Sequence, residues 1–148
     1  TEPRRSVMDL RASALDGQDL AAAIQSGTRM WTAGSGVDVE VEVDGPAAQL
    51  PEEMEQHLLR IAQEAVTNAL KHAGARRIAV TLHLEARKLF LRIVDDGRGF
   101  DELDAFCSRG GHFGLIGMRE RAERMGGELR LSSHPGEGTE LEVTVPLP

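Results

Sequence analysis

Five stretches of the chain alternate apolar and polar residues. Successive side chains of a β-strand point to opposite faces of its sheet, so each stretch would present one apolar and one polar face. This pattern predicts five strands in a sheet with one covered face and one polar face. The stretches are residues 37–45, 78–85, 88–96, 128–134 and 139–147.

Three other stretches, residues 16–31, 50–74 and 114–127, repeat apolar residues at helical spacing. Pro51 suits the first turn of the longest helix, and Gly74 suits its end. The order is then helix, strand, helix, two strands, helix, two strands. This order predicts an α/β (α+β) two-layer sandwich, a mixed five-stranded sheet covered on one face by three helices.

Composition narrows the class of protein. The 148 residues suffice for one domain with a core. The net charge of -7 disfavours nucleic acid and anionic membrane surfaces as partners. The single cysteine, Cys107, excludes an internal disulfide and favours a reducing compartment. With no long apolar run and no signal peptide, we expect a cytoplasmic domain without membrane contact.

The longest predicted helix carries a polar stripe beside its apolar face. At about 100° per residue, Glu64, Asn68 and Lys71 fall within about 60° of one another, and His72 lies further round. A carboxylate, a carboxamide and a cation so placed can position a water, hold a hard cation and contact a phosphate. A solvated helix shoulder is the simpler alternative.

The strand at 88–96 runs directly into the sequence D-D-G-R-G. Asp95 at a strand end can accept a hydrogen bond from an exocyclic amine. Gly97 and Gly99 lack side chains, so a flat ring could approach the backbone closely. An ordinary Asp-Gly turn would use the same residues.

Two glycine-rich segments follow. Residues 101–113 lack a hydrophobic period, so we expect a loop there, leading through Gly114 and Gly117 into the third helix. Free amides at a helix start bind anions. Thr139 follows a G-E-G turn and opens the last strand. A linker and a turn are the simpler explanations of these two segments.

In this order, the four segments resemble the ATP-binding domain of the GHKL superfamily, which includes gyrase B, mismatch-repair ATPases and histidine kinases. The motifs are E-x-x-x-N-x-x-K-H, D-x-G-x-G, a glycine loop entering a helix, and G-x-G-T. The resemblance covers about residues 37–148, and it is strongest to sensor histidine kinases that partner helix-turn-helix response regulators. It implies a Bergerat-type fold that uses ATP and Mg²⁺.

The resemblance also implies roles for the matched residues. Asn68 would hold Mg²⁺, and Glu64 would orient or deprotonate the attacking group. Lys71 and His72 would lie near the phosphates, and Asp95 would accept the adenine amine. Asp96 stands where the family often has Asn. The other residues implied to contact the nucleotide are Gly97, Gly99, Gly114, Leu115, Gly117, Met118 and Thr139.

The family's phosphoacceptor motif, a His followed by Asp or Glu on a long helix, is absent from this sequence. We therefore expect residues 1–16 to end a dimerisation helix and linker, and 17–148 to form a catalytic domain, monomeric on its own. Its partners would be its own dimerisation domain and, through the full protein, a response regulator. An anti-sigma-factor serine kinase and a non-catalytic nucleotide-sensing module remain as alternatives.

Overall fold

The computed structural model describes residues 17–45, 50–71, 73–99 and 114–147. The predicted helix end at 1–16, the loop at 101–113 and His72 lie outside these residues. The elements are α1 (Gly17–Thr32), β1 (Asp38–Asp44), α2 (Glu52–Lys71), β2 (Arg77–Leu84), β3 (Lys88–Asp95), α4 (Leu115–Arg124), β4 (Glu128–Ser133) and β5 (Thr139–Pro146).

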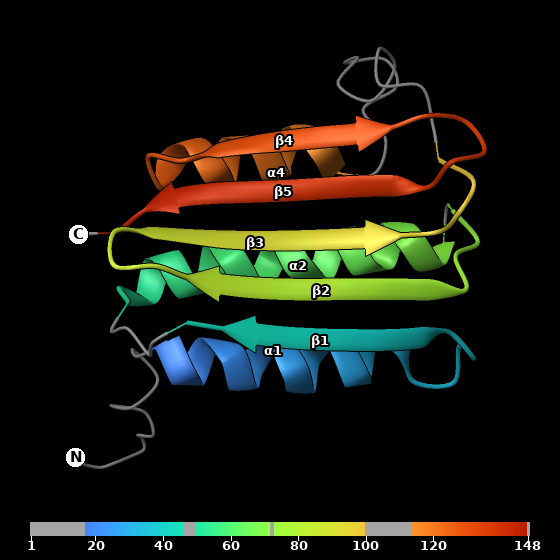
Figure 1. The fold of residues 1–148 in the computed structure, drawn as a ribbon, viewed down its shortest axis with the longest axis horizontal. Helices are drawn as coiled ribbons and strands as arrows, with labels where there is room; N and C mark the ends of the chain where they lie inside the picture. The colour runs from blue at the N-terminus through green and yellow to red at the C-terminus, as the bar shows by residue number, and fades with distance from the viewer. Residues whose placement is uncertain (1–16, 46–49, 72, 100–113, 148) are drawn as a thin grey trace.

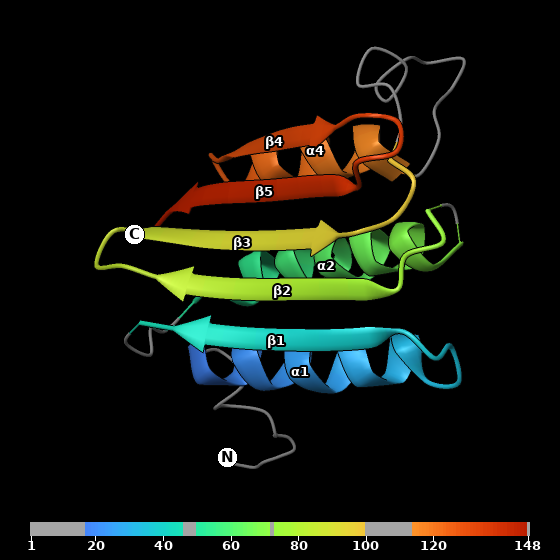
Figure 2. The same cartoon turned by 45° about the vertical axis from the view of Figure 1, so that its right-hand side comes forward.

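The described elements form one mixed five-stranded sheet with helices on a single face (Figure 1). The strand order is β1-β2-β3-β5-β4, so β1 and β4 are the edges. The β1–β2 pair is parallel, with α2 in its crossover, and the other pairs are antiparallel. The turned view shows α1, α2 and α4 behind the sheet (Figure 2). The predicted two-layer sandwich is therefore confirmed.

The helix α2 is central to the core because its apolar stripe faces the sheet. The side chains on its buried face include Leu58, Ile61 and Val66, each fully buried. They meet the alternating apolar residues of the strands, such as Leu82 and Leu91, which are also fully buried. Each such side chain contributes about 1.5–3 kcal/mol over its exposed state. The apolar residues that repeat every 3.6 residues in α2 and every two residues in the strands thus pack against each other at one interface.

The strand β1 is less covered than the centre of the sheet. Val39 and Val41 are half-buried, and Val43 is 38% exposed. On the opposite face, the side chains of β1 are all carboxylates and all exposed. These are Asp38, Glu40, Glu42 and Asp44.

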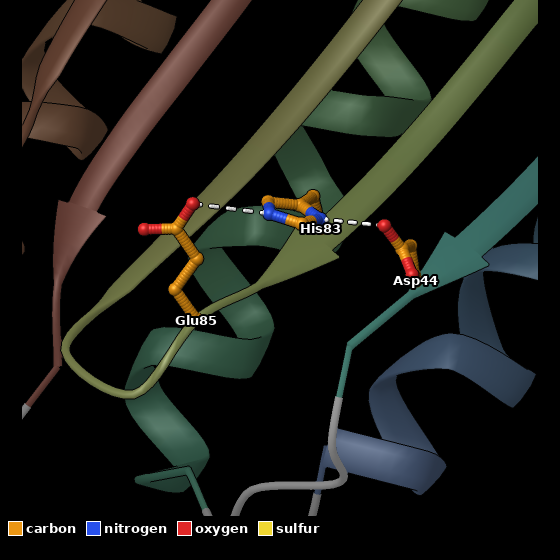
Figure 3. Close-up of polar contacts among 3 residues, drawn as sticks. All are labelled: Asp44, His83 and Glu85. Atoms are coloured by element: carbon orange, nitrogen blue, oxygen red, sulfur yellow. Dashed lines mark hydrogen bonds and ion pairs between the residues drawn. The ribbon is translucent and has the colours of Figure 1, made fainter.

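The uncovered face of the sheet carries polar contacts at the ends of β1 and β2. His83 on β2 lies between two carboxylates, with Nδ1 3.0 Å from Asp44 Oδ2 and Nε2 3.2 Å from Glu85 Oε2 (Figure 3). The contact to Asp44 joins the ends of β1 and β2. The His83 ring also meets the Phe90 ring on β3, at 5.8 Å between centroids. Both ring nitrogens of this histidine are therefore engaged.

Candidate functional site

A cavity lies between the sheet and the helices α2 and α4, at the end of the sheet where β3 stops and β5 begins. It holds about 490 Å³ of empty space, including its open mouth. Its polar groups come from three segments far apart in the sequence, Asn68 of α2, Asp95 of β3 and Thr139 of β5. The remaining lining residues are Ala65, Ala73, Ile93, Gly99, Leu115, Leu131 and Leu141.

The sheet register aligns the polar residues of the cavity. Asp95 and Thr139 are direct partners across β3 and β5, and Thr139 and Ser133 are direct partners across β5 and β4. Asp95, Thr139 and Ser133 each lie on the face of their strand that carries apolar side chains at its other positions. Opposed residues on neighbouring strands have Cβ atoms about 4.5–5.5 Å apart. A row of three polar side chains therefore ends the apolar face of the sheet.

The Asp95 carboxylate is half-buried in this apolar setting. Burial raises the pKa of Asp95 above its ordinary value; a hydrogen bond from the Gly97 amide opposes this, and the nearby Asp96 charge adds to it. The Gly97 amide donates to Asp95 Oδ1 at 2.8 Å. This bond fixes the side chain, and the second oxygen is available to accept from a group in the cavity.

The neighbouring Asp96 serves the fold. Its Oδ1 accepts from the backbone amides of Arg76 and Arg77, at 2.8 and 2.9 Å. These bonds tie the end of β3 to the start of β2. The Arg77 and Arg76 amides lower the pKa of Asp96 below its ordinary value of 3.8. The sequence pattern did not reveal this role, because the two amides lie 20 and 19 residues away.

Asp96→Ala is expected to lower the melting temperature at neutral pH, because both amides lose their acceptor. Asp96→Asn keeps an oxygen at the same place and should restore most of the loss. Since the folded pKa is lowered, the contribution of the Asp96 charge is present above pH 3.8 and fades as pH falls through the folded pKa. Thermal melts of both variants from pH 7 to pH 3 test this. Equal melting temperatures of Asp96→Ala and the parent at pH 7 would contradict it.

Close backbone packing explains the glycines around the strand end. A Cβ on Gly97 would lie 2.5 Å from Ala73 Cβ, at the end of α2. Gly99 has φ +66°, and a Cβ there would lie 2.1 Å from the His134 carbonyl oxygen. Gly138 has φ +79°, and a Cβ there would lie 2.3 Å from the Asp95 carbonyl oxygen. The absence of side chains at Gly99 and Gly138 lets the β4–β5 turn pack directly on the end of β3.

The helix α4 meets α2 at Glu64. Gly114 is the N-cap of α4, in the left-handed conformation and without a side-chain cap. A Cβ on Gly114 would lie 2.0 Å from Glu64 Oε2, so a larger residue there would displace this carboxylate, and the φ of +67° also favours glycine. The other oxygen, Oε1, accepts from Arg60 Nε at 3.1 Å, and the Glu64 side chain is 26% exposed. A carboxylate therefore stands at the amide end of α4.

This geometry agrees with a family comparison. Residues 53–148 match the model of the family described as "Histidine kinase-, DNA gyrase B-, and HSP90-like ATPase". The match covers α2, the site and the strands β2 to β5.

The chain belongs to this ATPase family.

Relatives of this ATPase domain include two bacterial sensor kinases. The chain is 33% identical over 146 residues to the signal transduction histidine-protein kinase/phosphatase DegS of Brevibacillus brevis, covering 99% of this chain and 37% of that protein. It is 32% identical over 148 residues to the sensor histidine kinase LiaS of Bacillus subtilis, covering 99% and 39%. The chain thus spans well under half of these relatives.

Solved structures show the same fold. The Erythrobacter litoralis blue-light activated histidine kinase superposes with a TM-score of 0.67 at 26% identity, over 88% of this chain and 41% of that one. The isolated histidine kinase domain of that protein gives 0.64 at 24% identity, over 88% and 60%. The second likeness concerns the fold alone.

Three other residues expected at the ATPase site are not among the residues that line the cavity: Lys71, Gly117 and Met118. Lys71 is exposed at the last residue of α2. Met118 is fully buried in the core. Gly117 is half-buried on α4, with open space where a Cβ would point. His72 lies outside the described residues. Nucleotide contact by Lys71, His72, Gly117 and Met118, as by the other expected site residues, stays a prediction.

Within 17–45, 50–71, 73–99 and 114–147, no group of three or more His, Cys, Asp or Glu side chains could hold a metal ion. Over the same residues, no helix has the length and apolar character needed to cross a bilayer.

Proposed function

We propose that this ATPase domain binds Mg-ATP in the described cavity and transfers the γ-phosphoryl group to a histidine of a separate dimerisation domain. The observation that carries the proposal is the meeting of Asn68, Asp95 and Thr139 in one cavity, from three distant segments. The names of the two relatives described above, both histidine kinases, support the choice of acceptor.

The sheet end of the cavity suits adenine. Its walls are mostly apolar, as a flat aromatic ring requires, and Asp95 stands at its end as an acceptor. Asp95 Oδ1 is occupied by the Gly97 amide, so the other oxygen would take the amine of the base. The half-buried carboxylate has lost much of its water, and a ligand donor would replace it.

The helix end of the cavity suits phosphates. Gly114 leaves the first amides of α4 without a side-chain cap, and such amides attract anions. Asn68 offers one amide oxygen from α2, which suits Mg²⁺ when phosphate oxygens and waters complete the coordination. When bound, Mg²⁺ would neutralise charge developing on the transferred group.

Glu64 is the candidate to act on the attacking group. It lies one helical turn before Asn68, and its two oxygens face Arg60 and Gly114. The carboxylate can thus orient or accept a proton from an incoming imidazole, while Arg60 restricts its motion. Positioning supplies most of the catalysis in such transfers.

The domain boundary at residue 17 is part of the proposal. The helix α1 packs against α2 and β1, and its Leu20 and Ile24 are buried in the common core. Residues 17–148 would therefore act as one catalytic domain. Residues 1–16 would join it to a dimerisation helix, and the full protein would pass the phosphoryl group to a response regulator.

The test supplies the chain with Mg²⁺, γ-labelled ATP and the dimerisation domain of its own full-length protein. We expect slow labelling of a histidine on that domain and none on this chain. The reaction is slow because tethering, worth about millimolar effective concentration, is lost. Glu64→Gln should reduce the transfer about 100-fold or more, with little change in ADP affinity. Asn68→Ala should remove the Mg²⁺ dependence of ATP binding.

Matched controls separate the alternatives. Glu52→Gln, at the far end of α2, should leave transfer unchanged. Label on a serine of an antagonist protein would favour the anti-sigma kinase. ATP binding without transfer to any partner would favour a sensing module. Stable phosphohistidine on this chain alone would contradict an acceptor elsewhere.

A further inference from the structure

Ser133 is a buried hydroxyl beside the cavity that the proposed mechanism does not use. It is 2% exposed and ends β4. Along β4 it continues the face of Leu129 and Leu131, both of which pack against the core. A hydroxyl at a position of this kind needs hydrogen-bond partners to offset its lost hydration.

The Ser133 hydroxyl has a single hydrogen and takes part in two hydrogen bonds beside the cavity. Ser133 Oγ donates to the Gly138 carbonyl oxygen at 3.1 Å, and it lies 2.8 Å from Thr139 Oγ1. Gly138 is itself buried, so its carbonyl is costly to leave without a donor. Either hydroxyl could donate in the second contact, but a serine hydroxyl has one hydrogen, so the arrangement that gives the Gly138 carbonyl its donor uses the hydrogen of Thr139 between the two side chains. In this arrangement Thr139 donates to Ser133.

The direction of the Thr139 hydroxyl hydrogen determines what this end of the cavity offers to a ligand. With its hydrogen turned toward Ser133, Thr139 presents only lone pairs to the space that it lines. Its direct partner on β3, Asp95, is a carboxylate and also an acceptor. The two neighbouring groups at this end of the site are thus both acceptors. An amino group carries two N–H donors, one for each acceptor, directly or through one water.

We infer that Ser133 is a positioning residue that holds the Thr139 hydroxyl as an acceptor, so that the site selects a base with an amino group over one with an oxo group. This inference rests on the proposed function, because it concerns the base that fills the cavity. An oxo group would face two acceptors and find no donor, which costs binding.

The experiment compares three diphosphates by calorimetric titration: ADP, IDP with an oxo group, and purine riboside diphosphate with neither group. In Ser133→Ala the Thr139 hydroxyl is released and can turn its hydrogen into the cavity. The preference for ADP over IDP should then fall about fivefold, the worth of one ordinary hydrogen bond. Purine riboside diphosphate should bind the variant and the parent alike.

Two further variants show whether Ser133 acts through Thr139. Thr139→Val removes the hydroxyl without changing the shape of the side chain. In that background, Ser133→Ala should not change the preference further, since coupled residues are not additive. Ser133→Cys has a slightly larger side chain and only a weak donor, and it replaces the alanine variant if that variant does not fold. Ser132→Ala, exposed on the other face of the sheet, is the matched control.

The outcomes separate this inference from the proposed function. Selective ADP binding by the parent, with an unchanged preference in Ser133→Ala or an equal shift in the Thr139→Val background, would overturn the role of Ser133 alone. Equal binding of ADP and IDP by the parent would do the same. No ADP binding by the parent would overturn the proposed function and this inference with it.

Discussion

Asp95→Asn is expected to weaken ADP binding about 5- to 150-fold. The substitution replaces the free carboxylate oxygen by an amide donor, which then faces the donor of the base. Leaving such a buried group unpaired costs about 1–3 kcal/mol. Calorimetric titration measures the loss, and Asp96→Asn is the matched control because its contacts lie on the β2 side. An unchanged ADP affinity would rule out adenine at this end of the cavity.

The same variant should be more stable than the parent without nucleotide. Burial raises the pKa of Asp95, so its ionised form opposes folding above the folded pKa. Asparagine carries no charge and can still accept from the Gly97 amide. The gain in melting temperature should be full at neutral pH and disappear as pH falls below the ordinary value of 3.8. Loss of binding with a gain in stability would separate a functional residue from a structural one.

Gly138→Ala should unfold the chain far more easily than Gly136→Ala. Both glycines lie in one turn with similar positive φ, +79° and +81°, so both variants carry about 1–3 kcal/mol of backbone strain. A Cβ on Gly136 meets nothing within 4 Å, whereas a Cβ on Gly138 lies 2.3 Å from the Asp95 carbonyl oxygen. Backbone must shift in the second case, and we expect a total loss above about 4 kcal/mol.

Urea denaturation of the two glycine variants measures this difference. Gly138→Ala should also bind ADP more weakly, since the backbone shift there separates Asp95 from Thr139. Gly136→Ala should bind ADP like the parent. Equal unfolding free energies for the two variants would show that the turn yields without disturbing β3.

The elements of the fold could be predicted because each depends on a short-range period. The alternation in 78–85 and 88–96 marked strands with one buried face, and the structure buries Leu82 and Leu91 on that face. The helical spacing in 50–74 likewise placed Leu58 inside. Predicted ends differ from observed ones by a few residues, because helix and strand ends depend on packing with distant segments.

The arrangement of the site could be predicted only in part. The motifs indicated Asp95 and Thr139 separately, but their direct pairing depends on strand register, which tertiary packing sets. The signal for Ser133 was a hydroxyl at a β4 position where alternation with Leu129 and Leu131 favours an apolar residue. Met118 was assigned to the nucleotide by resemblance, whereas helical spacing from Leu115 suits the core that the structure shows.

The carboxylates of β1 bear on how copies of this chain meet. An edge strand exposes unpaired backbone groups along one side, and another strand can add to them. The side chains of any such added strand would lie beside the four carboxylates of β1, which are Asp38, Glu40, Glu42 and Asp44. A second copy of β1 would bring four more negative charges, so the sheet is protected from growing into a fibre at this edge. Concentrated salt, with a screening length of about 3 Å at 1 M, would weaken that protection.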